Sequence, residues 1–266
     1  MRREWGCVTF SERLMSYGRT LLPPRIRERI LFYRNGTSEL AGALLHSVSG
    51  TVLTCLPAGD RIDARLAERL ADRLTRTGIS MVMGVANEVR FVESLLSVRP
   101  RHTVDYLLMA REAAVALSPM DAEWFSVRRA NEADTEQLAP LQLGYEVEEV
   151  LLPGRALNTT IALRNLRRRL RTQQTFVAEC DGKVIGMAGT NARGFLYDQI
   201  GGVYTVAEQR NRGVSRALIA RITQFAATEG KRLCLFVKRS NAAAVHIYAS
   251  SGFVVREGFR ISYYDR

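Results

Sequence analysis

The chain has 266 residues, of which 47% are hydrophobic, and a formal net charge of +11 at pH 7. This apolar content can fill one large or two modest globular cores, which excludes a chain that is disordered throughout. The N-terminal residues lack the apolar run of a signal peptide, and no segment approaches the roughly 20 apolar residues that span a bilayer, so we expect a cytoplasmic protein with no membrane partner.

Cysteine and histidine spacing gives no sign of a metal or of a disulfide framework. The cysteines are Cys7, Cys55, Cys180 and Cys234, and the histidines are His46, His102 and His246. No Cys-x-x-Cys pair occurs and no histidine stands at ligand spacing from another histidine or a cysteine. The sequence therefore predicts buried free thiols and no bound metal, with His246 an ordinary helix residue.

Residues 1–120 carry the pattern of a small α/β domain. The predicted strands are 52–56, 79–85 and 104–109, and the predicted helices are 64–77 and 87–98. A short polar linker with a proline follows at Leu117-Ser118-Pro119-Met120-Asp121. We therefore expect two domains, 1–120 and 124–266.

The second domain is expected to begin with a strand that leads into a helix, at 126–134. Further on, Leu163, Leu166 and Leu170 recur at helical spacing, so residues 163–171 should form an amphipathic helix. Its arginines, Arg164, Arg167, Arg168, Arg169 and Arg171, would form its wet face. A solvated face is the favoured interpretation; a clamp for an anionic ligand or for RNA stays open.

Residues 175–189 should form a β-hairpin. Apolar segments at 175–179 and 184–189 flank Asp181-Gly182. An Asp-Gly pair between apolar strands favours a tight turn in which both central residues have positive φ.

The most informative segment is an apolar strand, 202–206, that runs into a basic turn and then into a helix near Val214. A helix start leaves N–H groups unpaired and carries partial positive charge, so it favours an anion such as phosphate. Gly213 lets the backbone approach such a ligand, and Asn211 tolerates a left-handed conformation. Full charges come from Arg210, Arg212 and Arg216, while Ser215 is small and can donate its hydroxyl.

A second set of motifs follows, with a strand at 233–237, a helix that carries Tyr248, and a final strand. Three motifs, Arg210-x-x-Gly213-x-Ser215, Asn241-x-x-Ala244 and Tyr248-x-x-x-Gly252-Phe253, together resemble those of the GCN5-related N-acetyltransferase (GNAT) superfamily. The resemblance extends over 124–266 and departs from the family at Ser215, where glycine or alanine is usual.

The resemblance implies an α/β fold with a mixed, mostly antiparallel central sheet flanked by helices, and acetyl-CoA as co-substrate. The residues that it assigns to acetyl-CoA are Tyr204, Thr205, Val206, Arg210, Asn211, Arg212, Gly213, Val214, Ser215, Arg216 and Asn241. Backbone N–H groups near Tyr204 to Val206 would polarise the thioester, and Asn241 would touch the pantetheine arm. Tyr248 would be the catalytic acid that protonates the departing thiolate.

The residue that accepts the proton of the attacking amine is left open by the sequence. Carboxylates near the expected site are Asp198, Glu146, Glu148, Glu149 and Glu208. Glu208 is better interpreted as a solvated acid of the turn, and none of the others stands out.

The sequence of residues 78–87 is similar to that of residues 230–241, and Asn87 aligns with Asn241. We therefore interpret the first domain as a diverged, GNAT-like repeat. The alternative is an unrelated α/β segment. Its phosphate turn would be lost, because Asp60 and Asp63 replace arginines and would repel a pyrophosphate. Ser94 stands where Tyr248 would align. The first domain is therefore predicted to be a scaffold or substrate-side wall.

Three functions follow from the sequence. The favoured one is an acetyl-CoA-dependent N-acetyltransferase that moves an acetyl group to a primary amine by direct attack in a ternary complex. The alternatives are a non-catalytic acyl-CoA-binding regulator and a basic nucleic-acid-binding protein on the same fold; the charge of +11 keeps nucleic acid open, but no interleaved aromatic residues indicate base stacking. The acceptor amine and the oligomeric state are not indicated.

Overall fold

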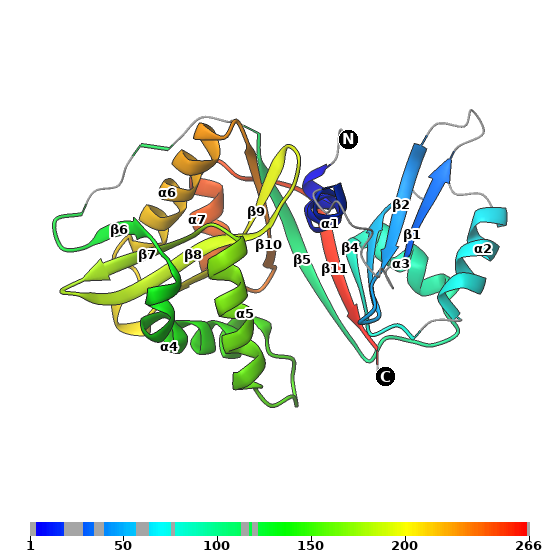
Figure 1. Cartoon of the computed structure of the whole chain (residues 1–266), viewed down its shortest axis with the longest axis horizontal. Coiled ribbons are helices and arrows are strands. Elements are labelled where there is room, and N and C mark those ends of the chain that lie inside the picture. The colour runs from blue at the N-terminus through cyan, green and yellow to red at the C-terminus, as the bar shows by residue number, and fades with distance from the viewer. Residues whose placement is uncertain are drawn as a thin grey trace. The chain divides into compact units, whose positions relative to one another are not determined.

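The computed structural model describes residues 4–18, 29–34, 40–56, 64–75, 78–112, 117–118 and 122–264 (Figure 1). They form an α/β fold with a mixed, mostly antiparallel sheet and flanking helices, as the sequence predicts. The chain separates into two compact units: Met1–Met109, Phe236–Asn241 and Val255–Arg266 form the first, and Ala110–Leu235 and Ala242–Val254 form the second. The predicted domains, 1–120 and 124–266, stay a prediction.

The described residues of the first unit form three helices and both antiparallel and parallel strand pairs. Its helices are α1 (Val8–Gly18), α2 (Ala64–Thr75) and α3 (Ala86–Leu95), after a short 3-10 turn, η1 (Glu4–Gly6). Its strands are β1 (Arg29–Arg34), β2 (Leu40–His46), β3 (Thr51–Cys55), β4 (Met81–Val85), and most of β5 (His102–Arg111) and of β11 (Val254–Tyr263). Hydrogen-bonded neighbours follow the order β1-β2-β3-β4-β11-β5, and β3 pairs with β4 in parallel.

All five predicted elements of this unit are present, with ends that differ by a few residues. Their apolar positions explain them: Leu70 and Leu74 of α2 and Val89 and Val92 of α3 are buried in one cluster with Val82 of β4. No element was predicted where α1, β1 and β2 lie. The expected turn at 57–63 lies outside the described residues.

Five strands lie in the part of the second unit that the structure describes. These are β6 (Ser126–Arg129), β7 (Thr175–Cys180), β8 (Lys183–Arg193), β9 (Tyr197–Thr205) and β10 (Arg232–Lys238), the last three residues of which are grouped with the first unit. Their order is β10-β9-β8-β7-β6, with β9 and β10 parallel and the other pairs antiparallel.

The same described residues contain four α-helices, with short helical turns beside them. The helices are α4 (Thr135–Tyr145), α5 (Thr159–Thr172), α6 (Val214–Thr228) and α7 (Ala242–Ser250). The turns are η3 (Glu132–Asp134), the π-helical η4 (Glu146–Val150) and η5 (Ala207–Gln209).

Helices cover both faces of this sheet (Figure 1). Val177 and Met187 are buried in one cluster with Leu138 of α4 and Leu166 of α5. On the other face, the Phe176 ring lies 6.0 Å from the Phe225 ring of α6. Alternate residues of a strand point to opposite faces, which is why neighbouring residues of β7 reach different helices.

The predicted hairpin is confirmed, since β7 and β8 pair antiparallel around Asp181-Gly182. Both turn residues have positive φ, 49° at Asp181 and 72° at Gly182. These signs are those of the tight turn that an Asp-Gly pair favours.

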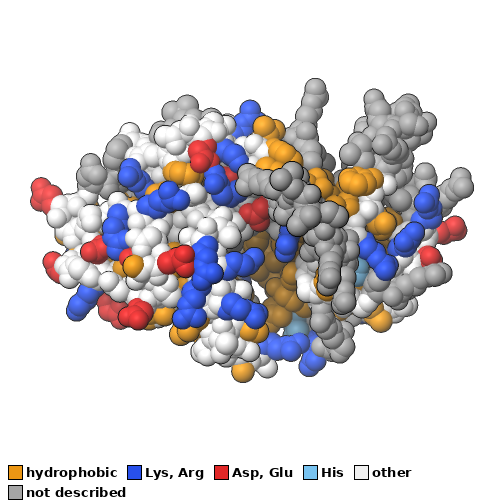
Figure 2. All heavy atoms as spheres, in the orientation of Figure 1, with side chains coloured by type: hydrophobic (Ala, Val, Ile, Leu, Met, Phe, Trp, Pro, Cys, Tyr) orange, Lys and Arg blue, Asp and Glu red, His pale blue; other side chains and the backbone are white. Residues whose placement is uncertain are grey.

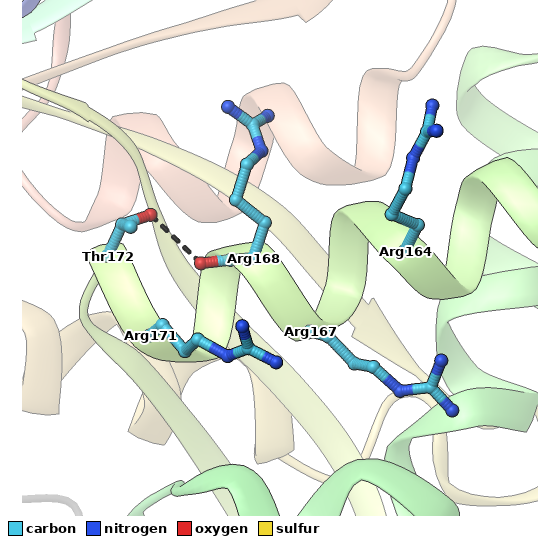
Figure 3. Close-up of a pocket in the computed structure, with 5 residues that line it drawn as sticks. All are labelled: Arg164, Arg167, Arg168, Arg171 and Thr172. Atoms are coloured by element: carbon cyan, nitrogen blue, oxygen red, sulfur yellow. Dashed lines mark hydrogen bonds between the residues drawn. The ribbon is translucent and has the colours of Figure 1, made fainter.

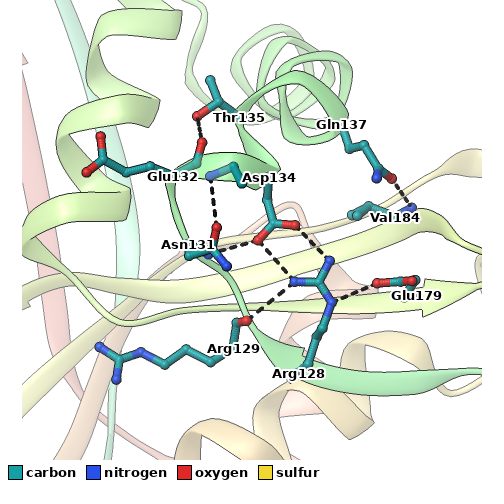
Figure 4. A network of polar contacts seen from close by, with 10 residues as sticks. Arg128, Arg129, Asn131, Glu132, Asp134, Thr135, Gln137, Glu179 and Val184 are labelled. Carbon is teal, nitrogen blue, oxygen red and sulfur yellow. Dashed lines mark hydrogen bonds and ion pairs between the residues drawn. The ribbon is translucent and has the colours of Figure 1, made fainter.

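A charged network fixes the entry of the chain into α4 (Figure 4). Arg128 of β6 donates to both carboxylate oxygens of Asp134, at 2.7 and 3.0 Å, and to Glu179 of β7 at 2.7 Å. Asp134 also accepts the N–H of Asn131, whose side chain accepts the N–H of Ala133, so a capping box closes the first turn. Hydrogen bonds from Arg128 lower the pKa of Asp134, against the opposing effect of burial.

We predict that Asp134→Asn lowers the free energy of unfolding by about 2 kcal/mol at pH 7, because the partly buried Arg128 loses the carboxylate that accepts two of its hydrogen bonds. Since the pKa of Asp134 is lowered in the fold, its stabilising contribution is present above the ordinary carboxyl pKa of about 4 and disappears as the pH falls below it. Urea titrations at several pH values measure this, with the exposed Glu136→Gln as the control. An equal effect of both variants at pH 7 would contradict the prediction.

Candidate functional site

One backbone edge of β9 is only partly paired. Along its other edge β9 pairs with β8 over most of its length. Toward β10, the paired residues are Tyr197, Asp198 and Gln199, opposite Arg232, Leu233 and Cys234. Among the described strands, nothing else pairs with β9, so the N–H and C=O groups of residues 200–205 that face away from β8 have no strand partner.

Alternation along the strand indicates which groups face this free edge. The N–H of Val206 donates to the Ile185 carbonyl of β8 at 3.0 Å, so Tyr204, two residues earlier, also faces β8. Thr205 and Val203 then face the free edge. Arg210 is consistent with this, because its Nε donates to the Thr205 carbonyl at 3.1 Å. Among the residues whose N–H groups were predicted to polarise the thioester, Thr205 is thus the one that faces the free edge. Val203 faces it too, but the sequence did not single out this residue.

A β-bulge precedes these residues. The register moves from Gly189↔Gly201 to Met187↔Tyr204, so two residues of β9 lie opposite one residue of β8. Gly202 has φ of +63°, a conformation that glycine adopts without strain.

The turn after β9 presents backbone N–H groups to open space. Asn211 and Gly213 have φ of 61° and 86°, as the sequence predicted for a left-handed turn. Gly213 begins α6 with no side-chain cap, and the first backbone bond into the helix is Ala217 N–H to the Gly213 carbonyl. Among the described residues, no acceptor meets the N–H groups of residues 211–216. A Cβ at Gly213 would have no neighbour within 4 Å.

Arg210 is held at the end of β9 by an acidic partner that the sequence did not pair with it. Its Nη2 donates to both carboxylate oxygens of Glu148, at 2.8 and 2.9 Å, and its guanidinium lies over the Tyr204 ring. The Tyr204 hydroxyl donates to the same carboxylate at 2.9 Å. The hydrogen bond from Arg210 lowers the pKa of Glu148, and burial raises the pKa of Tyr204.

The other predicted residues of the turn are close together. The hydroxyls of Ser215 and Thr205 are 2.9 Å apart, so serine at this position ties α6 to β9. Arg212 lies over the Trp124 ring and donates to Gln209, and Arg216 is exposed. Val214 is buried against β8, where a Cβ at Gly186 would meet it.

Tyr248 is buried in α7, with its ring 6.0 Å from that of Phe253. Its hydroxyl makes no hydrogen bond to any residue that the structure describes. Burial, followed by the nearby Tyr145 and Glu149, raises the pKa of Tyr248, so the phenol stays protonated at neutral pH. Asn241 lies in the turn between β10 and α7, where its N–H donates to the Lys238 carbonyl at 3.0 Å.

The carboxylates proposed as bases are separated by their surroundings. Asp198 is buried at the far end of β9 and pairs with Arg193 and Lys231, at 3.0 and 3.3 Å. Seven residues of strand, about 23 Å, separate it from Thr205, which rules out a role at the turn. Glu208 is exposed. Glu146 and Glu149 lie in the π-helical turn η4, a rare conformation that often occurs at functional sites.

The arginines of α5 form an exposed face, with one exception. Arg164, Arg167, Arg168 and Arg171 line a surface hollow with Thr172, and Figure 3 shows their guanidinium groups extending outward and apart. Arg171 pairs with Glu132 at 2.7 Å, whereas the described residues offer no acidic partner to the other three. Figure 2 shows basic side chains spread over the visible face with acidic ones between them.

Arg169 does not belong to that wet face, which corrects the prediction for this helix. Its Nη2 donates to Gln142 at 2.8 Å and contacts the Met187 sulfur at 3.5 Å. A Cβ at Gly202 would overlap its Nη1. The nearby Tyr145 is partly buried; burial raises its pKa, and the positive charge of Arg169 opposes this effect. Neither residue was singled out from the sequence, because a buried arginine within an arginine run has no distinct spacing.

The described residues contain no group of three His, Cys, Asp or Glu side chains that could hold a metal ion, and no helix long and apolar enough to cross a membrane. None of the four cysteines forms a disulfide; Cys7 and Cys234 are buried as predicted, and Cys55 and Cys180 are only partly buried. The sulfur atoms of Cys7 and Cys55 are 3.0 Å apart, which their spacing in the sequence did not indicate.

Comparison with known proteins places the site within a family model. Residues 145–253 match the model of the acetyltransferase (GNAT) family. This range contains β9, the turn, α6 and Tyr248, so the GNAT resemblance predicted for the second half is confirmed. No curated protein matches the sequence.

Solved structures share the fold over both halves. A Drosophila protein is 15% identical with a TM-score of 0.68, over 97% of this chain and 89% of its own. A GCN5-related N-acetyltransferase from Kribbella flavida is 13% identical with a TM-score of 0.61, over 98% and 96%. A tandem GNAT protein from the clavulanic acid biosynthesis pathway is 12% identical with a TM-score of 0.57, over 96% and 92%. The first half is therefore GNAT-like in fold, as the predicted repeat requires.

Proposed function

We propose that this chain, whose C-terminal half belongs to the GNAT acetyltransferase family, is an acetyl-CoA-dependent N-acetyltransferase that acts on a primary amine. The observation that carries the proposal is the run of backbone N–H groups at residues 211–216, which have no acceptor among the described residues. Such a run at a helix start is an anion site, and the pyrophosphate of acetyl-CoA is an anion of suitable size.

The rest of the cofactor would follow β9. Its free edge at residues 200–205 offers backbone groups to the amides of the pantetheine arm, which can pair as a short extra strand. Arg212 and Arg216 add positive charge at the turn, while Arg210 is already engaged by Glu148. Asn241 is proposed as a further contact of the arm.

The chemistry is direct transfer. The amine nitrogen attacks the thioester carbonyl carbon, the carbon–sulfur bond breaks, and the thiolate of CoA takes a proton. The free-edge N–H of Thr205 would stabilise the negative oxygen of the intermediate, with Val203 next along the edge. Tyr248 would supply the proton to sulfur, because its hydroxyl is unpartnered among the described residues and stays protonated.

The acceptor's ammonium group must lose a proton before its nitrogen can attack. We assign the acceptance of this proton to a carboxylate of η4. Both Glu146 and Glu149 act electrostatically on Tyr145, and Glu149 also acts on Tyr248, the proposed acid, which supports their choice. Either could accept the proton through water.

Cofactor binding is tested first by calorimetric titration with acetyl-CoA. We predict that Gly213→Glu binds at least tenfold more weakly than Gly213→Gln, a difference of about 1.4 kcal/mol or more. Both variants strain the same backbone, whose φ is 86°, and both enter open space, so only the charge differs. Equal weakening in the two variants would contradict the anion site, and wild-type protein that does not bind acetyl-CoA would overturn the function.

We predict that Tyr248→Phe lowers kcat about 100-fold with little change in KM, because proton donation to the leaving thiolate is lost. An acid must be protonated to act, and the pKa of Tyr248 is raised, so wild-type kcat should not fall until the pH exceeds the ordinary tyrosine value of about 10. Initial rates of thiol release across pH measure both effects. An unchanged kcat in the variant would remove Tyr248 from the mechanism.

The regulator alternative makes a different prediction from the same assays. A non-catalytic acyl-CoA-binding protein would bind acetyl-CoA at the turn but release no CoA with any amine, and Tyr248→Phe would alter nothing. Titration and rate measurements on one preparation therefore separate the two functions.

The exposed arginines of α5 favour nucleic-acid binding as a second candidate. Arg164, Arg167 and Arg168 lie within two turns with no acidic partner among the described residues, and phosphates would relieve their repulsion. If this function holds, labelled RNA should bind with an affinity that falls steeply with salt, and Arg164→Glu with Arg168→Glu should abolish it while Gly213→Glu does not. Fluorescence anisotropy decides this, and affinity that survives the double variant would exclude this face.

A further inference from the structure

Arg169 makes no direct ion pair with the described residues, and Glu146 acts on it only across Gln142. It is the arginine of α5 that turns inward, between the buried Leu166 and the half-buried Leu170. Its recorded side-chain partners, Gln142 and the sulfur of Met187, are both uncharged. No acidic side chain of the described residues lies within ion-pair distance.

Donors of this guanidinium are left over. The Nε is buried and has no hydrogen-bond partner, and Nη1 makes no hydrogen bond to any described residue. Burial lowers the pKa of Arg169, which reflects the cost of removing a cation from water. Arg169 as a whole is partly buried, but its Nε is out of contact with water and has no partner. A charge withdrawn from water is normally retained only where an opposite charge compensates it, so we expect an anion from outside the protein to bind here.

The position of the guanidinium relates this anion to the reaction. Nη1 occupies the space in which a side chain at residue 202 would stand, so the charge lies against the bulge of β9. The bulge comes immediately before the free edge that we assign to the thioester.

Glu146 places a negative charge on the far side of Gln142. The amide of Gln142 accepts from Arg169 through its oxygen and donates to Glu146 through its nitrogen, at 2.8 Å in both cases. A cation and an anion are thus separated by a single neutral side chain, an arrangement that complements a molecule with a carboxylate and an ammonium group a few bonds apart.

We infer that the acceptor is an amine that carries its own carboxylate, as a free amino acid does, and that Arg169 binds this carboxylate beside the Gly202 bulge. A guanidinium fork binds a planar carboxylate with directional hydrogen bonds, which a simple amine cannot use. This inference rests on the proposed acetyltransferase function, and it names the class of substrate for that site.

The test compares matched acceptors with acetyl-CoA and the full chain. The pairs are L-lysine with 1,5-diaminopentane, L-ornithine with 1,4-diaminobutane, L-histidine with histamine, L-phenylalanine with phenethylamine, and L-tyrosine with tyramine. Release of CoA thiol gives kcat and KM for each. We expect kcat/KM to be at least tenfold higher for the carboxylated member of the best pair.

Arg169→Gln should lower that preference at least tenfold, mainly through a higher KM for the carboxylated acceptor. Arg168→Gln, the neighbouring exposed arginine, should leave the preference unchanged and is the matched control. Arg169→Lys keeps the positive charge but loses the planar guanidinium, so its preference for the carboxylated acceptor should lie between those of Arg169→Gln and Arg168→Gln. Calorimetry with acetyl-CoA on Arg169→Gln shows whether the variant is folded and binds the cofactor normally.

Several results would overturn the inference. One is equal kcat/KM for the two members of every pair, and another is no acetylation of any of these acceptors. A third is an equal loss of kcat/KM for both members of a pair in Arg169→Gln, which would indicate a role at the bulge rather than in binding a carboxylate. If wild-type protein does not bind acetyl-CoA, the proposed function fails and the inference fails with it. Binding without a preference rejects the inference alone.

Discussion

The site depends on how the backbone of β9 ends. A strand in the middle of a sheet normally has both edges satisfied, but β9 keeps β10 as a partner for three residues and then continues with β8 alone. The bulge at Gly202 and the left-handed residues Asn211 and Gly213 let the chain turn from this strand into α6 without a side-chain cap. Because each of these features leaves N–H groups without acceptors, the backbone itself becomes the binding surface.

The side chains around this backbone mainly fix its conformation rather than enlarge the binding surface. Arg210, expected at the phosphate, is tied to Glu148, to the Thr205 carbonyl and to the Tyr204 ring. Ser215 is likewise used for a bond to Thr205. An exposed ion pair contributes little to the free energy of folding, so the value of the Arg210 contacts lies in fixing where β9 ends.

The sequence predicted those parts of the fold that depend on local chemistry. The Asp181-Gly182 turn, the left-handed Asn211 and Gly213, and the buried leucines of α5 follow from the residues themselves. Contacts between distant residues could not be predicted in this way: Glu148 and Arg210 are 62 positions apart, and the inward turn of Arg169 is set by α4 and β9 rather than by α5. The assignment of the N–H groups at 203–206 also required the observed register, since a shift of one residue reverses which edge each group faces.

The first half of the chain has the same kind of fold, but its central parallel strands do not separate in this way. There β3 and β4 are the parallel pair, and the Thr54 side chain lies directly against Gly84 beyond their last paired residues. The N–H of Leu56, just after β3, donates to the carboxylate of Glu88 in the first turn of α3, at 3.1 Å. A carboxylate at this point satisfies a backbone donor and would repel a phosphate. The fold is therefore compatible with either an open or a closed strand edge. Which of the two forms depends on whether a few side chains provide acceptors for the backbone N–H groups where the central strands separate.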